Sequence, residues 1–319
     1  LITGNTASGP AADDGGGGIF NNGGTLNITG ATISDNIADG AGGSGGGLFS
    51  LAGTVNVTDT TLSFNSAVRA GGGVEIVDGT LTLMNSNLVS NDVNGLAGPA
   101  APGNGGGLHV SGAAATVTID GGSVFGNLAA SEGGGLWNQA GSTLIVQNGA
   151  LVDSNEAFGA DATNGGGGIF NNGGVLTITG AGTTISNNYA SGTAGSGGGI
   201  FNDAGGVLSV TDATISGNVA NRAGGGIEAT AGTSTTLTNV QLLSNNTGVS
   251  PDAVAAPGNG GGLHITGAGD ATIQGGTVTG NVAAREGGGL WNGSGTMTIT
   301  GTLITGNTAS GPAADDGGG

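Results

Sequence analysis

The chain of 319 residues contains 77 glycines, 21 acidic side chains against 3 basic ones and no cysteine, which gives a formal net charge of −18. This acidic balance excludes a nucleic-acid-binding surface, because phosphate backbones are bound by clustered Lys and Arg side chains. The lack of cysteine excludes disulfide scaffolds and thiolate metal sites, and no apolar run is long enough for a membrane-spanning helix.

The first complete unit, residues 16–36, contains three short alternating segments that are typical of β-strands. These segments, GIFN, TLNIT and ATIS, are separated by Gly, Asn and Asp, which favour turns. No stretch has the apolar period of a helix of about ten residues. The expected core positions are Ile19, Leu26, Ile28 and Ile33 here, with Ile169, Leu176, Ile178 and Ile185 as their later equivalents.

The same unit recurs along the whole chain. Three glycines followed by an aliphatic residue occur ten times, and each unit closes on an Asn that lies three residues after an aliphatic one. We expect these Asn side chains to form a hydrogen-bonded ladder at turn positions, where Asn also tolerates a left-handed backbone. The predicted Asn ladder comprises Asn5, Asn36, Asn65, Asn91, Asn127, Asn155, Asn188, Asn218, Asn245, Asn281 and Asn307.

A longer period is superimposed on the unit. The residue after the repeated aliphatic follows the same order twice: Phe20, Phe49, Glu75, His109, Trp137, and then Phe170, Phe201, Glu228, His264, Trp291. This order predicts two homologous five-unit halves, about 5–155 and 156–307, within one continuous domain over 1–319. Residues 303–319 are identical to residues 1–17, so we expect a 302-residue period within a longer tandem array.

Short strands without connecting helices predict an all-β fold, a right-handed parallel β-helix (a solenoid) with about ten coils of three short strands. Parallel strands lie about 4.8 Å apart, so ten coils would rise about 48 Å. The glycine triplets suit tight corners that require positive φ or close backbone approach.

The motifs GGGIF and GGGLW alternate with ISDN, VFGN and ITGN. Over the whole chain this alternation resembles the glycine-rich and Phe-x-x-Asn repeats of chlamydial polymorphic outer-membrane proteins, and more broadly the β-helix passenger repeats of giant bacterial adhesins. The resemblance implies a secreted or surface-displayed protein with an adhesive or structural role.

The ten residues that follow the repeated aliphatic, which we call the outer column, are the most informative candidate site. Glu75 and His109 lie on adjacent coils, as do Glu228 and His264, and each pair could share a hydrogen bond. One hypothesis makes them a catalytic acid and base. The favoured hypothesis is a solvated surface pair with an arginine nearby, because the pair is duplicated in both halves.

The aromatic members of the outer column allow two interpretations. Facing outward, they would form an apolar contact strip for other fibres or for sugars. If the strand alternation is shifted by one residue, they would be core residues instead.

Five acidic residues precede glycine runs in loops, where carboxylates and carbonyls could hold Ca²⁺ or simply solvate the loop. They are Asp13, Asp14, Asp161, Asp315 and Asp316.

The sequence therefore predicts a non-enzymatic structural repeat of a secreted extracellular fibre or cell-surface adhesin. Its expected partner is itself, through coil stacking, with extracellular polysaccharide as a further candidate. No cofactor other than a weakly held Ca²⁺ is expected, and no membrane insertion by this segment. The alternative hypothesis is a polysaccharide-binding or polysaccharide-degrading β-helix, such as a lyase or hydrolase, which would carry a single unrepeated site.

Overall fold

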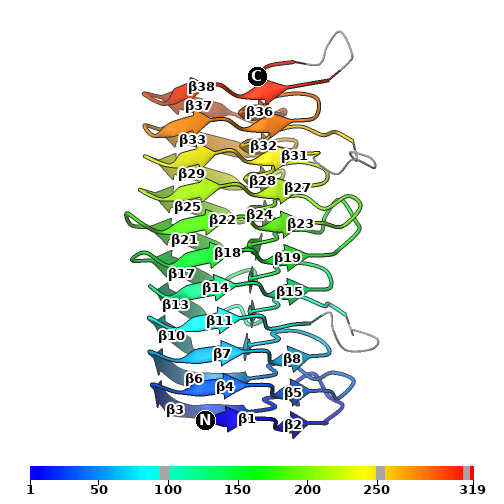
Figure 1. The fold of residues 1–319 in the computed structure, drawn as a ribbon, viewed down its shortest axis with the longest axis vertical. Helices are drawn as coiled ribbons and strands as arrows, with labels where there is room; N and C mark the ends of the chain where they lie inside the picture. Colours follow the sequence, from blue (N-terminus) through cyan, green and yellow to red (C-terminus); the bar gives the residue numbers. More distant parts are fainter. Residues whose placement is uncertain (94–100, 249–255, 312–316) are drawn as a thin grey trace.

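The computed structural model describes residues 1–93, 101–248, 256–311 and 317–319. Over these residues the chain is an all-β parallel solenoid of about ten turns, and it contains no helix (Figure 1). The coils stack in chain order from the N-terminal end to the C-terminal end, as predicted. No helix in this part of the chain is long and apolar enough to span a membrane.

One face of the solenoid is an eleven-stranded parallel sheet of short strands, one from each coil. Its strands are β1 (Ile2–Thr3), β4 (Thr32–Ser34), β7 (Thr61–Ser63), β11 (Asn87–Val89), β14 (Ser123–Phe125), β18 (Leu151–Asp153), β22 (Thr184–Ser186), β26 (Thr214–Ser216), β30 (Gln241–Leu243), β34 (Thr277–Thr279) and β38 (Leu303–Thr305).

The largest sheet has two strands in most coils. In the first two coils a single long strand replaces the two, β3 (Ile19–Thr29) in one and β6 (Leu48–Thr58) in the other. The strands that carry the outer column are β9 (Val74–Ile76), β12 (Leu108–Val110), β16 (Leu136–Asn138), β20 (Ile169–Asn172), β24 (Ile200–Asp203), β28 (Ile227–Ala229), β32 (Leu263–Ile265) and β36 (Leu290–Asn292). Each is followed by one of β10 (Thr80–Met84), β13 (Thr116–Asp120), β17 (Thr143–Gln147), β21 (Val175–Thr179), β25 (Val207–Thr211), β29 (Ser234–Thr238), β33 (Asp270–Gln274) and β37 (Met297–Thr300).

Each coil except the one that contains β11 ends in a further strand of two residues, which the sequence did not predict. These strands are β2 (Thr6–Ala7), β5 (Ile37–Ala38), β8 (Ser66–Ala67), β15 (Leu128–Ala129), β19 (Glu156–Ala157), β23 (Tyr189–Ala190), β27 (Val219–Ala220), β31 (Asn246–Thr247), β35 (Val282–Ala283) and β39 (Thr308–Ala309). Most coils thus have four strands rather than three, because two residues are too short to produce a recognisable alternation.

The strands pair in register although the coils differ in length. Leu176 on β21 lies opposite Leu208 on β25, and Ile178 lies opposite Val210. These side chains point inward and are fully or almost fully buried, so they build continuous aliphatic stacks along the axis. The predicted core positions are confirmed, with Ile19 and Leu26 of the first coil partly buried against the same core.

The Asn ladder is confirmed from Asn5 to Asn307. Each Asn Nδ2 donates to Oδ1 of the Asn on the next coil over 2.8–3.0 Å. The left-handed backbone falls one residue earlier than expected, on the residue that precedes each ladder Asn. Those residues are Gly4, Asp35, Phe64, Ser90, Gly126, Ser154, Asn187, Gly217, Ser244, Gly280 and Gly306.

The glycine triplets form corners in which adjacent coils approach closely. Gly133 has a φ of +62°, and a Cβ on the middle residue, Gly134, would lie 2.5 Å from the carbonyl oxygens of Glu156 and Gly167. Both expected reasons for glycine, positive φ and close backbone approach, therefore apply at the same corner.

Candidate functional site

The outer column is buried along most of its length. Its residues lie opposite one another across the parallel strands, so that His109 on β12 pairs with Glu75 on β9 and with Trp137 on β16. The eight members that are at most 5% exposed are Phe49, Glu75, His109, Trp137, Phe170, Phe201, Glu228 and His264. Phe20 on the first coil is exposed, and Trp291 near the last coil is partly exposed.

The interpretation of the column as an exposed contact strip is therefore wrong for these eight residues. They are not members of the aliphatic core either, since Trp137, Phe170 and Phe201 form an apolar cluster of their own. The column points out of the coil and is covered by loop residues. Glu132 shows how: its Oε2 accepts a hydrogen bond from Trp137 Nε1 over 3.0 Å, and its Oε1 accepts one from Asn164 of the next loop over 2.9 Å.

Glu75 and His109 form the hydrogen bond that the sequence suggested, and the pair is buried rather than solvated. His109 Nδ1 lies 2.8 Å from Glu75 Oε2, and in the second half His264 Nδ1 lies 2.7 Å from Glu228 Oε2. The expected arginine is present beside the second pair, where Arg222 Nη1 lies 3.9 Å from Glu228 Oε1.

A hydroxyl group donates a hydrogen bond to the second oxygen of each carboxylate. Ser111 Oγ donates to Glu75 Oε1 over 2.6 Å, and Thr266 Oγ1 donates to Glu228 Oε1 over 2.5 Å. In a nucleophilic triad the imidazole would accept the hydroxyl proton and the carboxylate would orient the imidazole. In the first-half site the hydroxyl and the imidazole both bind the carboxylate, an arrangement that satisfies a buried charge and does not activate a nucleophile.

The other ring nitrogen of each histidine is enclosed. His109 Nε2 and His264 Nε2 are buried and have no hydrogen-bond partner among the described residues. Each imidazole stacks on the neighbouring indole, with ring centroids 4.4 Å apart for His109 and Trp137, and 4.3 Å apart for His264 and Trp291. Proton exchange between His109 Nε2 and a large substrate would require the covering loops to move.

Glu132, which the sequence analysis missed, carries a buried carboxyl group beside Trp137. Burial raises the pKa of its carboxyl above the usual range, although hydrogen bonds from Trp137, Asn164 and Asn104 act in the opposite direction. Glu286 accepts the corresponding bond from Trp291 Nε1 over 2.7 Å. The sequence signal was available, because Glu precedes GGGLW in both halves.

A second, shorter amide ladder was also missed. Asn138 Nδ2 donates to Asn171 Oδ1 over 2.8 Å, and Asn171 Nδ2 donates to Asn202 Oδ1 over 2.7 Å. All three side chains are buried at the corner that follows the outer column. Their shared position two residues after the repeated aliphatic could have identified this ladder.

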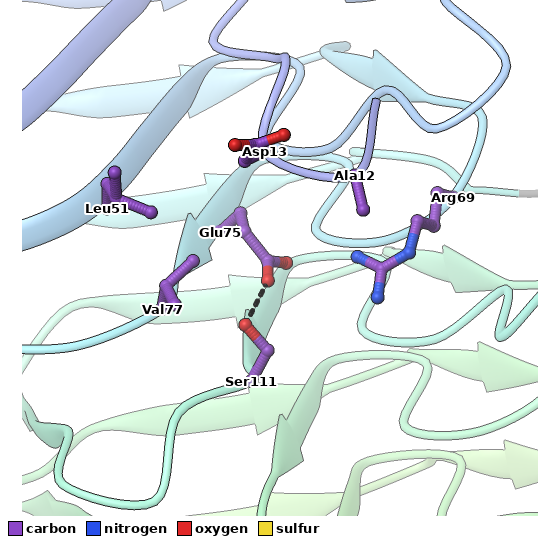
Figure 2. Close-up of a pocket in the computed structure, with 7 residues that line it drawn as sticks. All are labelled: Ala12, Asp13, Leu51, Arg69, Glu75, Val77 and Ser111. Carbon is purple, nitrogen blue, oxygen red and sulfur yellow. Dashed lines mark hydrogen bonds between the residues drawn. The ribbon is translucent and has the colours of Figure 1, made fainter. Parts of the chain in front are cut away.

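A pocket of about 210 Å³ opens beside Glu75 (Figure 2). Charged side chains of Asp13, Arg69 and Glu75 and the hydroxyl of Ser111 line it together with apolar groups. The remaining lining residues are Ala12, Leu51 and Val77. The pocket joins the loop that precedes β3 to residues of the second, third and fourth coils, so residues far apart in sequence share one small space.

The candidate Ca²⁺ residues do not converge. Asp14 accepts a hydrogen bond from the Ala11 N–H over 2.8 Å, Asp13 lines the pocket, and the Asp161 N–H donates to Asn164. Within the described ranges, no three His, Asp or Glu side chains form a group that could hold a metal ion. The other two candidates, Asp315 and Asp316, lie outside those ranges.

Comparison with known proteins gives no match to a family model, to a curated protein or to a solved structure.

Proposed function

We propose that the chain is a structural repeat of a secreted extracellular fibre or surface adhesin, in which copies join end to end by continued coil stacking. The observation that carries the proposal is the Asn ladder itself, because every coil presents the same hydrogen-bonding groups to the next. Along the ladder, each Asn donates its backbone N–H and its Nδ2 to Oδ1 of the next Asn, as Asn155 does to Asn188.

The first and last ladder residues of the chain show which groups a further coil would use. Asn5 donates to Asn36, and its own Oδ1 accepts no hydrogen bond from a described residue. Asn307 Oδ1 accepts from Asn281, and the Asn307 backbone N–H has no acceptor within the described coils. A second copy stacked on Asn307 would place its Asn5 Oδ1 as that acceptor.

Sequence identity supports the same arrangement. Because residues 303–319 repeat residues 1–17, the first and last parts of the chain contain the same strand and corner sequences. Stacking one copy on another would pair a Leu-Ile-Thr strand with an identical strand, and would extend the ladder without a change of residue type. Unpaired parallel edges favour such strand addition.

The acidic composition is compatible with rods that join at their ends and repel one another along their sides. A charge of −18 over about 48 Å gives a dense negative field, which salt screens over about 10 Å at roughly 0.1 M. End contacts, by contrast, are made mainly of uncharged backbone and amide groups.

Sedimentation velocity over a range of protein concentrations tests this proposal. The wild type is expected to form elongated species that grow in steps of one copy. Asn5→Ala, which removes the free acceptor, should weaken this association at least tenfold, since hydrogen bonds are worth about 1 kcal/mol each and two are lost. Asn27→Ala is the control, because Asn27 is an exposed amide on the side of the rod. Association that is absent, or that both variants weaken equally, would overturn the proposal.

Location can be tested separately by antibody labelling of intact source cells. Extracellular display predicts labelling without permeabilisation, and labelling that requires permeabilisation would contradict it.

A further inference from the structure

Arg69 brings unused hydrogen-bonding capacity to the pocket beside Glu75. Within the described residues its guanidinium donates one hydrogen bond, from Nη1 to Ser44 Oγ over 3.2 Å. Arginine has five N–H donors in a fixed planar fork. No carboxylate of the described residues forms an ion pair with Arg69, although the equivalent Arg222 lies 3.9 Å from Glu228. Figure 2 shows the guanidinium of Arg69 directed into the pocket.

Glu75 does not fill this capacity, since no ion pair joins it to Arg69 although both line the pocket. His109 Nδ1 lies 2.8 Å from Oε2, and Ser111 Oγ donates to Oε1 over 2.6 Å. A partly buried guanidinium with free donors is a preferred partner for a carboxylate, which it can bind through two parallel hydrogen bonds.

The rest of the pocket limits the kind of molecule that fits. The carboxylate of Asp13 lines the same space and can accept a hydrogen bond from a ligand hydroxyl or ammonium group. Leu51 and Val77 provide an apolar wall. A volume of about 210 Å³ equals the liquid share of roughly seven water molecules and lies below the usual size of sites for drug-sized ligands. One sugar ring or one amino acid is the appropriate scale.

The second half of the chain has different chemistry at the corresponding positions. Leu51 and Val77 are replaced by Asp203 and Thr230, and the Thr230 hydroxyl donates to the Asp203 carboxylate. The apolar wall is therefore particular to the first half, although the glutamate, the histidine and the arginine occur in both.

We propose that this pocket binds a small molecule that carries a carboxylate together with a neighbouring hydrogen-bond donor. Arg69 binds the carboxylate, Asp13 accepts from the donor, and Leu51 and Val77 contact the apolar part. Two sources share this chemistry: the uronic acid unit of a glycan and a free α-amino acid. The site adds ligand recognition to a chain whose proposed role is structural, and it does not depend on end-to-end stacking.

Isothermal titration of the whole chain with four probes tests the proposal. D-galacturonic acid and L-alanine each carry both groups. Acetate has the carboxylate without the donor, and D-galactose has hydroxyl donors without a carboxylate. Saturable binding of galacturonic acid or alanine, tighter than that of acetate and galactose, is expected; the tighter of the first two identifies the source. No saturable binding at about 10 mM, or equal binding of all four, overturns the proposal.

Substitutions locate the site. Arg69→Gln should weaken binding about tenfold or more, since a hydrogen-bonded charged group is lost. Arg222→Gln makes the same change in charge at the matching place in the second half, and should leave the affinity unchanged. Asp13→Asn should weaken binding of alanine more than that of galacturonic acid, because it removes the charge facing an ammonium group. Equal losses for Arg69→Gln and Arg222→Gln, with thermal unfolding unchanged, contradict the assignment.

Discussion

Removal of one ladder amide should destabilise the solenoid far more than removal of an exposed one. Asn155 is fully buried, and its side chain makes four hydrogen bonds. Its Oδ1 accepts from the Asn127 N–H and from Asn127 Nδ2, each over 2.9 Å. Its Nδ2 donates to the Val124 carbonyl and to Asn188 Oδ1, also over 2.9 Å.

Asn155→Ala removes all four bonds and leaves the backbone N–H of Asn127 without a partner among the described residues. A buried unsatisfied donor costs about 1–3 kcal/mol, and the other three bonds contribute about 1 kcal/mol each. The free energy of unfolding should therefore fall by about 4–6 kcal/mol.

Urea denaturation followed by tryptophan fluorescence measures this loss, because Trp137 lies in the same coil as Asn155. Asn27→Ala is the matched control: Asn27 is exposed and accepts one side-chain bond, from Asn56 over 2.8 Å, so the expected change is within about 0.5 kcal/mol. A loss below about 1 kcal/mol for Asn155→Ala would refute the idea that buried amide bonds between coils stabilise the fold.

Three further changes test other parts of the structure. Gly134→Ala should lower the free energy of unfolding by more than about 3 kcal/mol in thermal unfolding, because its Cβ would lie 2.5 Å from backbone atoms of the next coil. Gly149→Ala should cost about 1 kcal/mol, because Gly149 has a positive φ but open space around it. Equal costs would contradict the close approach of the coils at Gly134. Burial raises the pKa of Glu132, so ionisation of this carboxyl destabilises the folded state as the pH rises above about 4.5. The free energy of unfolding of Glu132→Gln should therefore increase relative to that of the wild type over this pH range. A constant difference between the two proteins would argue against a raised pKa. Glu75→Ala leaves both ring nitrogens of His109 without a partner among the described residues, so urea denaturation should show a loss of about 2–4 kcal/mol. A neutral effect would mean that water replaces the carboxylate.

The fold and its inter-coil bonds were predictable because each coil must present the same groups to the next. Ile33 and Asn36 follow a pattern of side-chain type that depends only on the strand and its turn, and that pattern recurs in every unit. The left-handed residue before each ladder Asn had a signal too, since glycine occupies that position in several units, as at Gly4 and Gly126.

The state of the outer column could not be derived in the same way. Alternation establishes that Phe170 and Glu228 point away from the aliphatic core, but it contains no information about the loops that lie over them. Those loops differ in length and lack an apolar period, so nothing in the sequence indicated that Asn164 would reach Glu132 and help to enclose Trp137. The pocket depends on the same loops, because Asp13 and Arg69 meet through the packing of coils that are distant in sequence.

The most direct test of the proposed function is the length of a covalent tandem of two 302-residue periods, measured by small-angle scattering against a single period. If the coils continue across the junction, the rod should lengthen by about 48 Å with an unchanged cross-section. A tandem that keeps the length of one period, with a doubled cross-section or two independently oriented rods, would contradict a fibre built by continued coil stacking.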